Sequence, residues 1–184
     1  MRIIQTLSVA GLLSIAGLAQ AARPAEAKYP NLTKSWDKLQ DAKKHLEEAE
    51  KAHAKTGGLG GHAANAVKEV AAAEKEIDEA IKFAAANTKA GAPGKVTDGA
   101  AKPGAPGFDD KKYPNLGAAH LDCEWAIIHV HEAMEYHAPT GTLGGHGEKA
   151  EEHLKAAQKE VLEAEKFAEA HAKPEAKPAS APAK

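Results

Sequence analysis

Three histidines of this chain recur in register when its sequence repeats itself 84 residues further on. The run Tyr-Pro-Asn-Leu at residues 29–32 returns at residues 113–116. Likewise, Thr-Gly-Gly-Leu-Gly-Gly-His at residues 56–62 returns as Thr-Gly-Thr-Leu-Gly-Gly-His at residues 140–146. Neutral imidazole is a common ligand of divalent metal ions, and a repeat shows which positions an architecture reuses. The matched histidines are therefore candidate metal ligands: His45 with His129, His53 with His137, and His62 with His146.

The spacing of these histidines limits which of them can share an ion. His45 and His53 are eight residues apart, about 12 Å along a helix, whereas the ligands of one ion each lie about 2 Å from it. His62 follows the glycine turn that comes after His53, so we expect these two at the same end of a helical hairpin, and likewise His137 and His146. If both turns lie at one end of the molecule, the four imidazoles could converge on one ion. Otherwise each repeat holds its own weaker site, completed by carboxylate or water.

His62 and His146 each open the second helix of their repeat. The partial positive charge of a helix N-terminus disfavours the imidazolium, and metal binding requires the neutral ring. His153 lies two turns after His146 on the same face and extends the candidate set, whereas the first repeat has Glu69 at that position. Imidazole-rich sites favour Cu(II), Ni(II) and Zn(II), and Cu(II) has the highest intrinsic affinity. The expected cofactor is a divalent metal ion, Cu(II) before Ni(II) or Zn(II).

Two sulfur-containing side chains of the second repeat have competing interpretations. Cys123 and Met134 could bind Cu(I), but both lie on the expected apolar stripe of their helix, where core packing is the usual role. Cys123 is the only cysteine, so no internal disulfide can form, although it could link two chains into a homodimer. The motif C-x-x-C-H is absent, which excludes a c-type haem attachment.

The sequence contains no motif that indicates an enzyme or a nucleic-acid-binding protein. No nucleophile has a base at a recognisable spacing, and no carboxylate–histidine set of the di-iron kind is present. The glycine turn is not followed by the Lys-Ser/Thr of a phosphate-binding loop. The net charge of −2 gives no concentrated basic face for nucleic acid. We therefore expect neither catalysis nor nucleic acid binding.

Residues 1–21 have the pattern of a secretory signal peptide. Arg2 is followed by an apolar stretch over residues 7–18 and by Ala-Gln-Ala at residues 19–21, a typical cleavage site. The apolar stretch is shorter than the roughly 20 residues that span a bilayer. We expect a periplasmic or secreted protein whose mature chain begins near Ala22 and has no integral membrane span.

Each repeat contains two stretches in which apolar residues recur every three or four positions, the pattern of a helix with one buried face. Ala, Glu, Lys and Leu fill the positions between them, and no proline interrupts the pattern. In chain order the four apolar stripes are Leu39, Ala42, Leu46, Ala49 and His53; Val70, Ala73, Ile77, Ala80 and Ala84; Cys123, Ala126, Val130, Ala133 and His137; and Leu154, Ala157, Val161, Ala164 and Ala168.

The helix ends also carry repeated signals. Pro139 disfavours helix in the residue before it, so the third helix should end near His137. Paired residues have the same expected role in both repeats: left-handed helix ends at Gly57 and Gly141, apolar plugs of the hairpin at Leu59 and Leu143, and helix caps or turn residues at Asn31 and Asn115.

The chain is expected to form two helical hairpins, at residues 22–89 and 113–173. A linker rich in Gly, Pro and Ala separates them at residues 90–112, and a disordered tail follows at residues 174–184. Since two hairpins bury more surface by packing on each other, we expect an all-α fold, an antiparallel four-helix bundle. Separate hairpins and a dimer are alternatives. The linker is long enough for either relative direction of the hairpins.

The helices and turns resemble the small metal-binding protein family, histidine-rich periplasmic four-helix bundles that bind copper and other divalent metals. The resemblance rests on the runs His45-Leu-Glu-Glu-Ala-Glu-Lys-Ala-His53 and Gly145-His146-Gly-Glu-Lys-Ala-Glu-Glu-His153-Leu-Lys-Ala, and it covers both repeats but not the linker or tail. It implies metal sequestration or buffering, with these ligands: His45, His53, His62, His129, His137, His146 and His153.

Two functions from different classes follow. The first is a periplasmic divalent-metal-binding protein, above all for copper, that acts as a metal buffer or scavenger. The alternative is a non-catalytic structural or interaction protein of the cell envelope that binds no metal. In that case His62 and His146 are turn residues, and His53 and His137 are polar plugs at the ends of their stripes.

Overall fold

The computed structural model describes residues 28–55, 58–87, 111–137 and 142–172. The expected signal peptide and tail, residues 90–110 of the linker, and Gly57 and Gly141 lie outside the described residues. The helices are α1 (Pro30–His53), α2 (His62–Asn87), α3 (Pro114–His137), the short 3₁₀ turn η2 (Thr142–Gly145) and α4 (His146–His171). Hereafter α1 and α2 are hairpin 1, and α3, η2 and α4 are hairpin 2.

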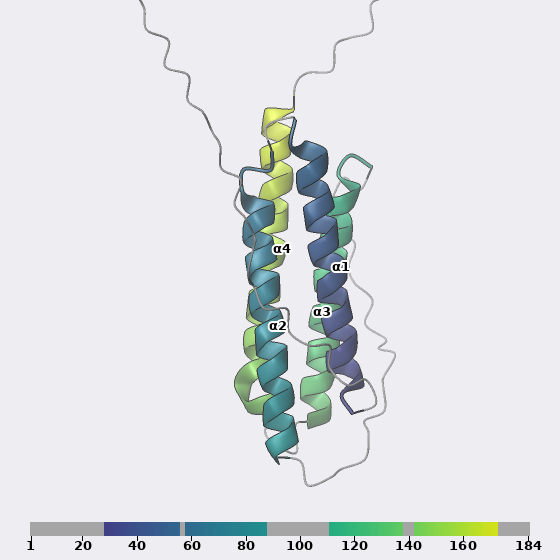
Figure 1. Ribbon diagram of the computed structural model, residues 1–184, viewed down its shortest axis with the longest axis vertical. Coiled ribbons are helices and arrows are strands. Elements are labelled where there is room, and N and C mark those ends of the chain that lie inside the picture. Colours follow the sequence, from purple (N-terminus) through teal and green to yellow (C-terminus); the bar gives the residue numbers. More distant parts are fainter. Residues whose placement is uncertain (1–27, 56–57, 88–110, 138–141, 173–184) are drawn as a thin grey trace, which may run out of the picture.

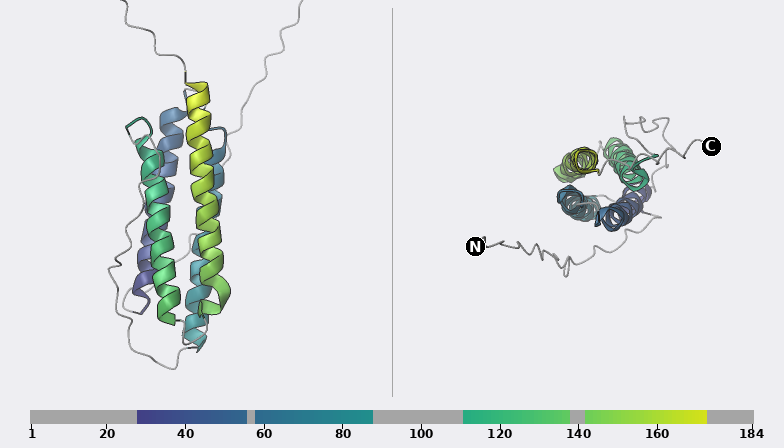
Figure 2. Two further views of the ribbon diagram at one scale, coloured as in Figure 1. Left: turned by 180° about the vertical axis from the view of Figure 1, so that it is seen from behind. Right: turned by 90° about the horizontal axis from the view of Figure 1, so that it is seen from above.

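The helices form one antiparallel four-helix bundle, which confirms the expected fold class (Figure 1). Viewed along its axis, each helix lies beside two others: α1 and α4 occupy one diagonal, and α2 and α3 the other (Figure 2). The most extensive contacts join α2 to α4 and α1 to α3. Contacts within each hairpin are less extensive, so each hairpin is stabilised mainly by the other one.

The two glycine turns lie at opposite ends of the bundle (Figure 1). At one end, where α1 ends and α2 begins, the His53 ring lies 5.5 Å from that of Tyr113, which precedes α3. At the other end, where α3 ends, the ring of His137 lies 6.4 Å from that of Tyr29, which precedes α1. The hairpins are therefore antiparallel to each other, and residues 88–110 connect opposite ends of the bundle.

The predicted apolar stripes form the core. Every residue of the four stripes is buried except His53, which is half-buried. Leu59 and Leu143 are 2% and 1% exposed, so both close the core at the turns as expected. Alanine supplies much of this core, which lets the helices approach closely. No helix within the described ranges is long and apolar enough to cross a membrane.

The helix starts differ from the prediction, whereas the end of α3 at His137 confirms it. α1 begins at Pro30, and the preceding Tyr29 makes no side-chain capping hydrogen bond. Asn31 lies inside the helix and is buried, so its predicted role as a cap is wrong. Asn115 is likewise inside α3, which begins at Pro114. Proline suits the first helical position because it lacks the N–H that would have no partner there.

Candidate metal-binding histidines

The four histidines nearest the turns do not converge on one ion. His53 and His62 lie at one end of the bundle and His137 and His146 at the other, because the turns are at opposite ends (Figure 1). At each end the two histidines also face different neighbours. His53 packs against Tyr113 before α3, whereas His62 faces α4. The arrangement with a single four-imidazole site is therefore excluded.

His53 and His137 pack on the repeated tyrosines of the opposite hairpin. The His53 ring is tilted against Tyr113, and the His137 ring is tilted against Tyr29. Both tyrosines are buried, and His137 is only 8% exposed. This reciprocal packing gives the tyrosine and the histidine of each repeat a structural role, because their side chains close the two ends of the core.

His62 and His146 instead each face a carboxylate of the opposite hairpin. Nδ1 of His62 lies 2.8 Å from Oε2 of Glu160, and Nδ1 of His146 lies 2.7 Å from Oε2 of Glu76. The two pairs are equivalent, because both the histidines and the glutamates are 84 residues apart. All four side chains are only partly buried, with 19–31% of their surface exposed. An ion from solvent can therefore reach either pair.

A second carboxylate lies one helical turn beyond each of these glutamates. These are Glu163 and Glu79, and the positive charge of the same histidines helps to lower their pKa values. In both cases the largest cause is a hydrogen bond from a lysine of the same helix, and the histidine is a smaller one. For Glu163, the lysine is Lys166 and the histidine is His62. For Glu79, the lysine is Lys82 and the histidine is His146.

Two further candidate ligands join the hairpins near the middle of the bundle. Nδ1 of His153 lies 2.8 Å from Oε2 of Glu69. Nδ1 of His45 lies 3.0 Å from one oxygen of Asp122, whose other oxygen accepts a hydrogen bond from Lys38 at 3.0 Å. Asp122 is 6% exposed, and both of its oxygens already have a partner in these two neighbours. This leaves His153 with Glu69 the more accessible of the two pairs.

The other predicted donors of α3 are less accessible. His129 is 9% exposed, stacks on Trp125 and lies 3.1 Å from Glu132. Cys123 is fully buried, and burial raises the pKa of its thiol to about 12, which disfavours the thiolate that metals and disulfide exchange require. A homodimer linked through Cys123 is therefore not supported by the fold. Met134 packs against the core, as the core interpretation expected.

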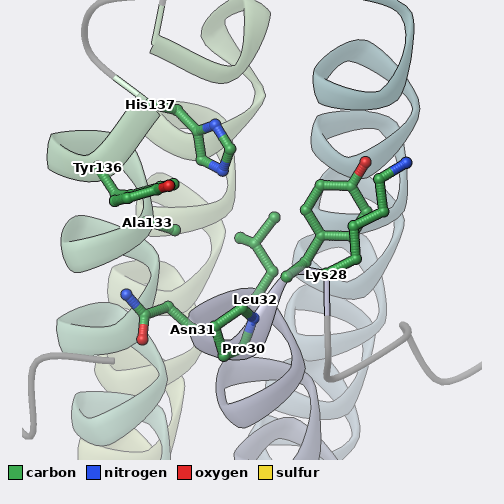
Figure 3. Close-up of a pocket in the computed structure, with 8 residues that line it drawn as sticks. Lys28, Pro30, Asn31, Leu32, Ala133, Tyr136 and His137 are labelled. Carbon is green, nitrogen blue, oxygen red and sulfur yellow. The ribbon is translucent and has the colours of Figure 1, made fainter. Parts of the chain in front are cut away.

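A shallow pocket lies between the start of α1 and the end of α3 (Figure 3). His137 and Tyr136 approach it from α3 and Leu32 from α1 (Figure 3). No carboxylate or thiol lines this pocket, so His137 is its single metal-binding side chain among the described residues. The pocket is narrow, with room for about one water molecule, and it offers no closed metal site.

Within the described ranges, no three side chains of His, Cys, Asp or Glu type come close enough together to hold a metal ion. The structure instead places a carboxylate beside five of the seven predicted histidines: His45, His62, His129, His146 and His153. Any ion bound at such a pair would take its remaining ligands from water. Such a site would be open and exchangeable rather than a closed structural site.

The glutamate partners were missed by sequence reasoning, although a signal for them exists. Glu76 and Glu160 occupy matching positions of the two repeats, as His62 and His146 do. Pairing the second helices of the repeats in antiparallel fashion brings each histidine to the glutamate of the other repeat. Without the direction of the hairpins, that pairing could not be chosen.

Acidification is expected to destabilise the bundle through two of its buried histidines, His137 and His120. Burial lowers the pKa of both His137 and His120 below the ordinary 6.5. Near and below that value the unfolded chain binds more protons than the folded one, so the free energy of unfolding falls as the pH falls. Urea unfolding at pH 7.5 and pH 5 should show a smaller acid-induced loss for His137→Gln than for the unchanged chain. The control is His171→Gln, at an exposed position. An equal fall in the free energy of unfolding of all three proteins would contradict the role given to His137.

No family model, curated protein or solved structure matches this chain. The resemblance to the small metal-binding protein family therefore rests on the quoted histidine runs. The function is argued below from the side chains themselves.

Proposed function

We propose that this protein binds divalent metal ions through histidine–carboxylate pairs on its surface, with Cu(II) preferred over Ni(II) and Zn(II). It would act as a metal buffer or scavenger in the periplasm. The observation that supports this proposal is the duplicated pair, His62 with Glu160 and His146 with Glu76, in which both partners recur in both repeats. The histidine runs shared with the small metal-binding protein family point in the same direction.

The donors in each pair suit this chemistry. Imidazole nitrogen is a common ligand of Cu(II) and Zn(II). A carboxylate at Nδ1 also fixes the tautomer and orientation of a ring whose Nε2 binds metal, and raises its basicity as a ligand. Because each pair supplies few protein donors, the affinity should be lower than that of a closed four-ligand site. Such an affinity fits a buffer, which must release its ions.

A calorimetric Cu(II) titration of the chain without residues 1–21 tests the proposal, with Zn(II) as comparison. The variant His62→Gln/His146→Gln should bind Cu(II) at least about tenfold more weakly, a loss of about 1.4 kcal/mol. The matched control is His53→Gln/His137→Gln, whose rings pack on tyrosines of the opposite hairpin. It should bind as the unchanged chain does, and an equal loss in both variants would contradict the assigned pairs.

The second candidate function is a non-catalytic structural or interaction protein of the cell envelope. It is favoured by the fact that the pairs of His45, His62, His146 and His153 each join one hairpin to the other. In this case the histidines hold the hairpins together and bind no metal. Absence of saturable Cu(II) binding, together with a loss of stability in His62→Gln/His146→Gln, would support this function over the first.

A further inference from the structure

The two hairpins are related by contacts that occur twice. The turn glycine of each hairpin packs on a phenylalanine of the other, Gly60 on Phe167 and Gly144 on Phe83. The same reciprocity holds for the histidine–glutamate pairs and the histidine–tyrosine contacts described above. Each residue in such a contact has its counterpart 84 positions away. Two copies of the same hairpin could therefore make all of these contacts equally well.

Two further contacts, called the single contacts below, each join positions that are equivalent in the repeats, so each of them occurs once. Lys38 lies 3.0 Å from Asp122, and Glu69 lies 2.8 Å from His153; in both pairs the partners are 84 residues apart. Each pair therefore lies where a residue of one hairpin faces the equivalent residue of the other hairpin. Pairing of like hairpins would place Lys38 opposite a second Lys38 and Asp122 opposite a second Asp122.

Like charges opposite each other at a helix contact are destabilising, and unlike charges favour the pairing that brings them together. The Lys38–Asp122 pair is partly buried, since the Asp122 side chain is 9% exposed, so solvent screens it less than a surface pair. The same argument applies to Glu69 opposite a second Glu69. The doubled contacts thus stabilise any pairing of hairpins, whereas the single contacts select hairpin 1 with hairpin 2.

We propose that the surface between the hairpins is a recognition surface for the opposite hairpin, and that it accepts this hairpin from a second copy of the chain. Where a chain's own hairpin cannot reach this surface, two copies would exchange hairpins reciprocally, and the contacts between hairpins would be kept in both bundles. A reciprocal exchange between two copies leaves no hairpin without a partner, so it closes at a dimer. This inference does not depend on metal binding.

The path of the chain gives a way to force the exchange. α2 ends at the end of the bundle opposite to the start of α3, so the connection must span a helix of 24 residues, about 36 Å. Deleting residues 92–107 leaves seven residues between Asn87 and Lys111, which reach about 25 Å when extended. Such a chain cannot pair its own two hairpins as the bundle requires. Two copies can form two bundles that lie antiparallel side by side, each made of hairpin 1 of one copy and hairpin 2 of the other.

The test is sedimentation velocity with far-ultraviolet circular dichroism on this deletion variant. We expect a helical dimer at micromolar concentration. The full chain should be monomeric under the same conditions, because its linker keeps the hairpins at an effective concentration of about millimolar. A helical monomer, or an unfolded monomer that does not assemble at 100 µM or so, would overturn the proposal.

Charge variants in the deletion background test the selection of the opposite hairpin. Lys38→Asp should weaken the dimer at least about tenfold, and adding Asp122→Lys should recover part of this loss. Unlike charges then face each other again, but the contact of Asp122 with His45 is lost. A dimer that is indifferent to Lys38→Asp would overturn the role of the single contacts. Failure of this experiment leaves the Cu(II) titration unaffected, so the two proposals are tested separately.

Discussion

Replacing Gly60 with alanine is expected to lower the free energy of unfolding by about 2–5 kcal/mol, although the residue lies in an exposed turn. Its backbone has φ +64, where an L-residue costs about 1–2 kcal/mol. A Cβ atom would also lie 2.6 Å from Cδ2 of Phe167 in the opposite hairpin, and displacing the ring costs about 1–3 kcal/mol. Gly144→Ala should have the same effect, because its Cβ would lie 2.5 Å from Phe83.

The matched control for Gly60 is its neighbour Gly61. Gly61 has φ +83, but a Cβ atom there would meet nothing within 4 Å. Gly61→Ala should therefore cost only the backbone term, about 1–2 kcal/mol. Urea unfolding of the three variants followed by circular dichroism measures the difference. If Gly60→Ala and Gly61→Ala had equal free energies of unfolding, the contact of the turn with Phe167 would contribute nothing to stability.

Leu143→Ala is expected to destabilise the bundle by about 2–5 kcal/mol, the usual cost of an emptied leucine site. Leu143 is 1% exposed, and its backbone adopts φ 54, an uncommon conformation for a residue other than glycine. The packing of its side chain must compensate for this conformation. Leu59→Ala should behave similarly, since Leu59 closes the opposite end of the core.

The control for the leucine variants is Leu121→Ala, at a position that is 40% exposed. It should cost less than about 1 kcal/mol, because little apolar surface is lost from the core. Thermal and urea unfolding measure the three variants together. A loss below about 1 kcal/mol for Leu143→Ala would mean that the hairpin ends are not part of the cooperative core.

The helices and their buried faces could be predicted from the sequence because their periodicity is local. Leu46, Ile77 and Leu154 lie on stripes whose spacing alone identifies the core face. The helix starts were predicted less well, because the tendency of Pro30 to occupy the first helical position overrides the capping tendency of Asn31.

The partners of the histidines could not be predicted, because they depend on how the hairpins lie relative to each other. Both a parallel and an antiparallel arrangement satisfy the apolar stripes and the length of the connection. Only the antiparallel arrangement brings His62 to Glu160 and His53 to Tyr113. These histidines make contacts between the hairpins, which sequence spacing within one repeat does not reveal.

The number of Cu(II) ions bound per chain, measured by calorimetry, tests the central claim of this account most directly. Because His62 and His146 lie at opposite ends of the bundle, we predict two equivalent sites per chain. His62→Gln should remove one site and leave the other at unchanged affinity. One ion per chain, lost in either single variant, would contradict the account, because it would require both imidazoles to bind the same metal.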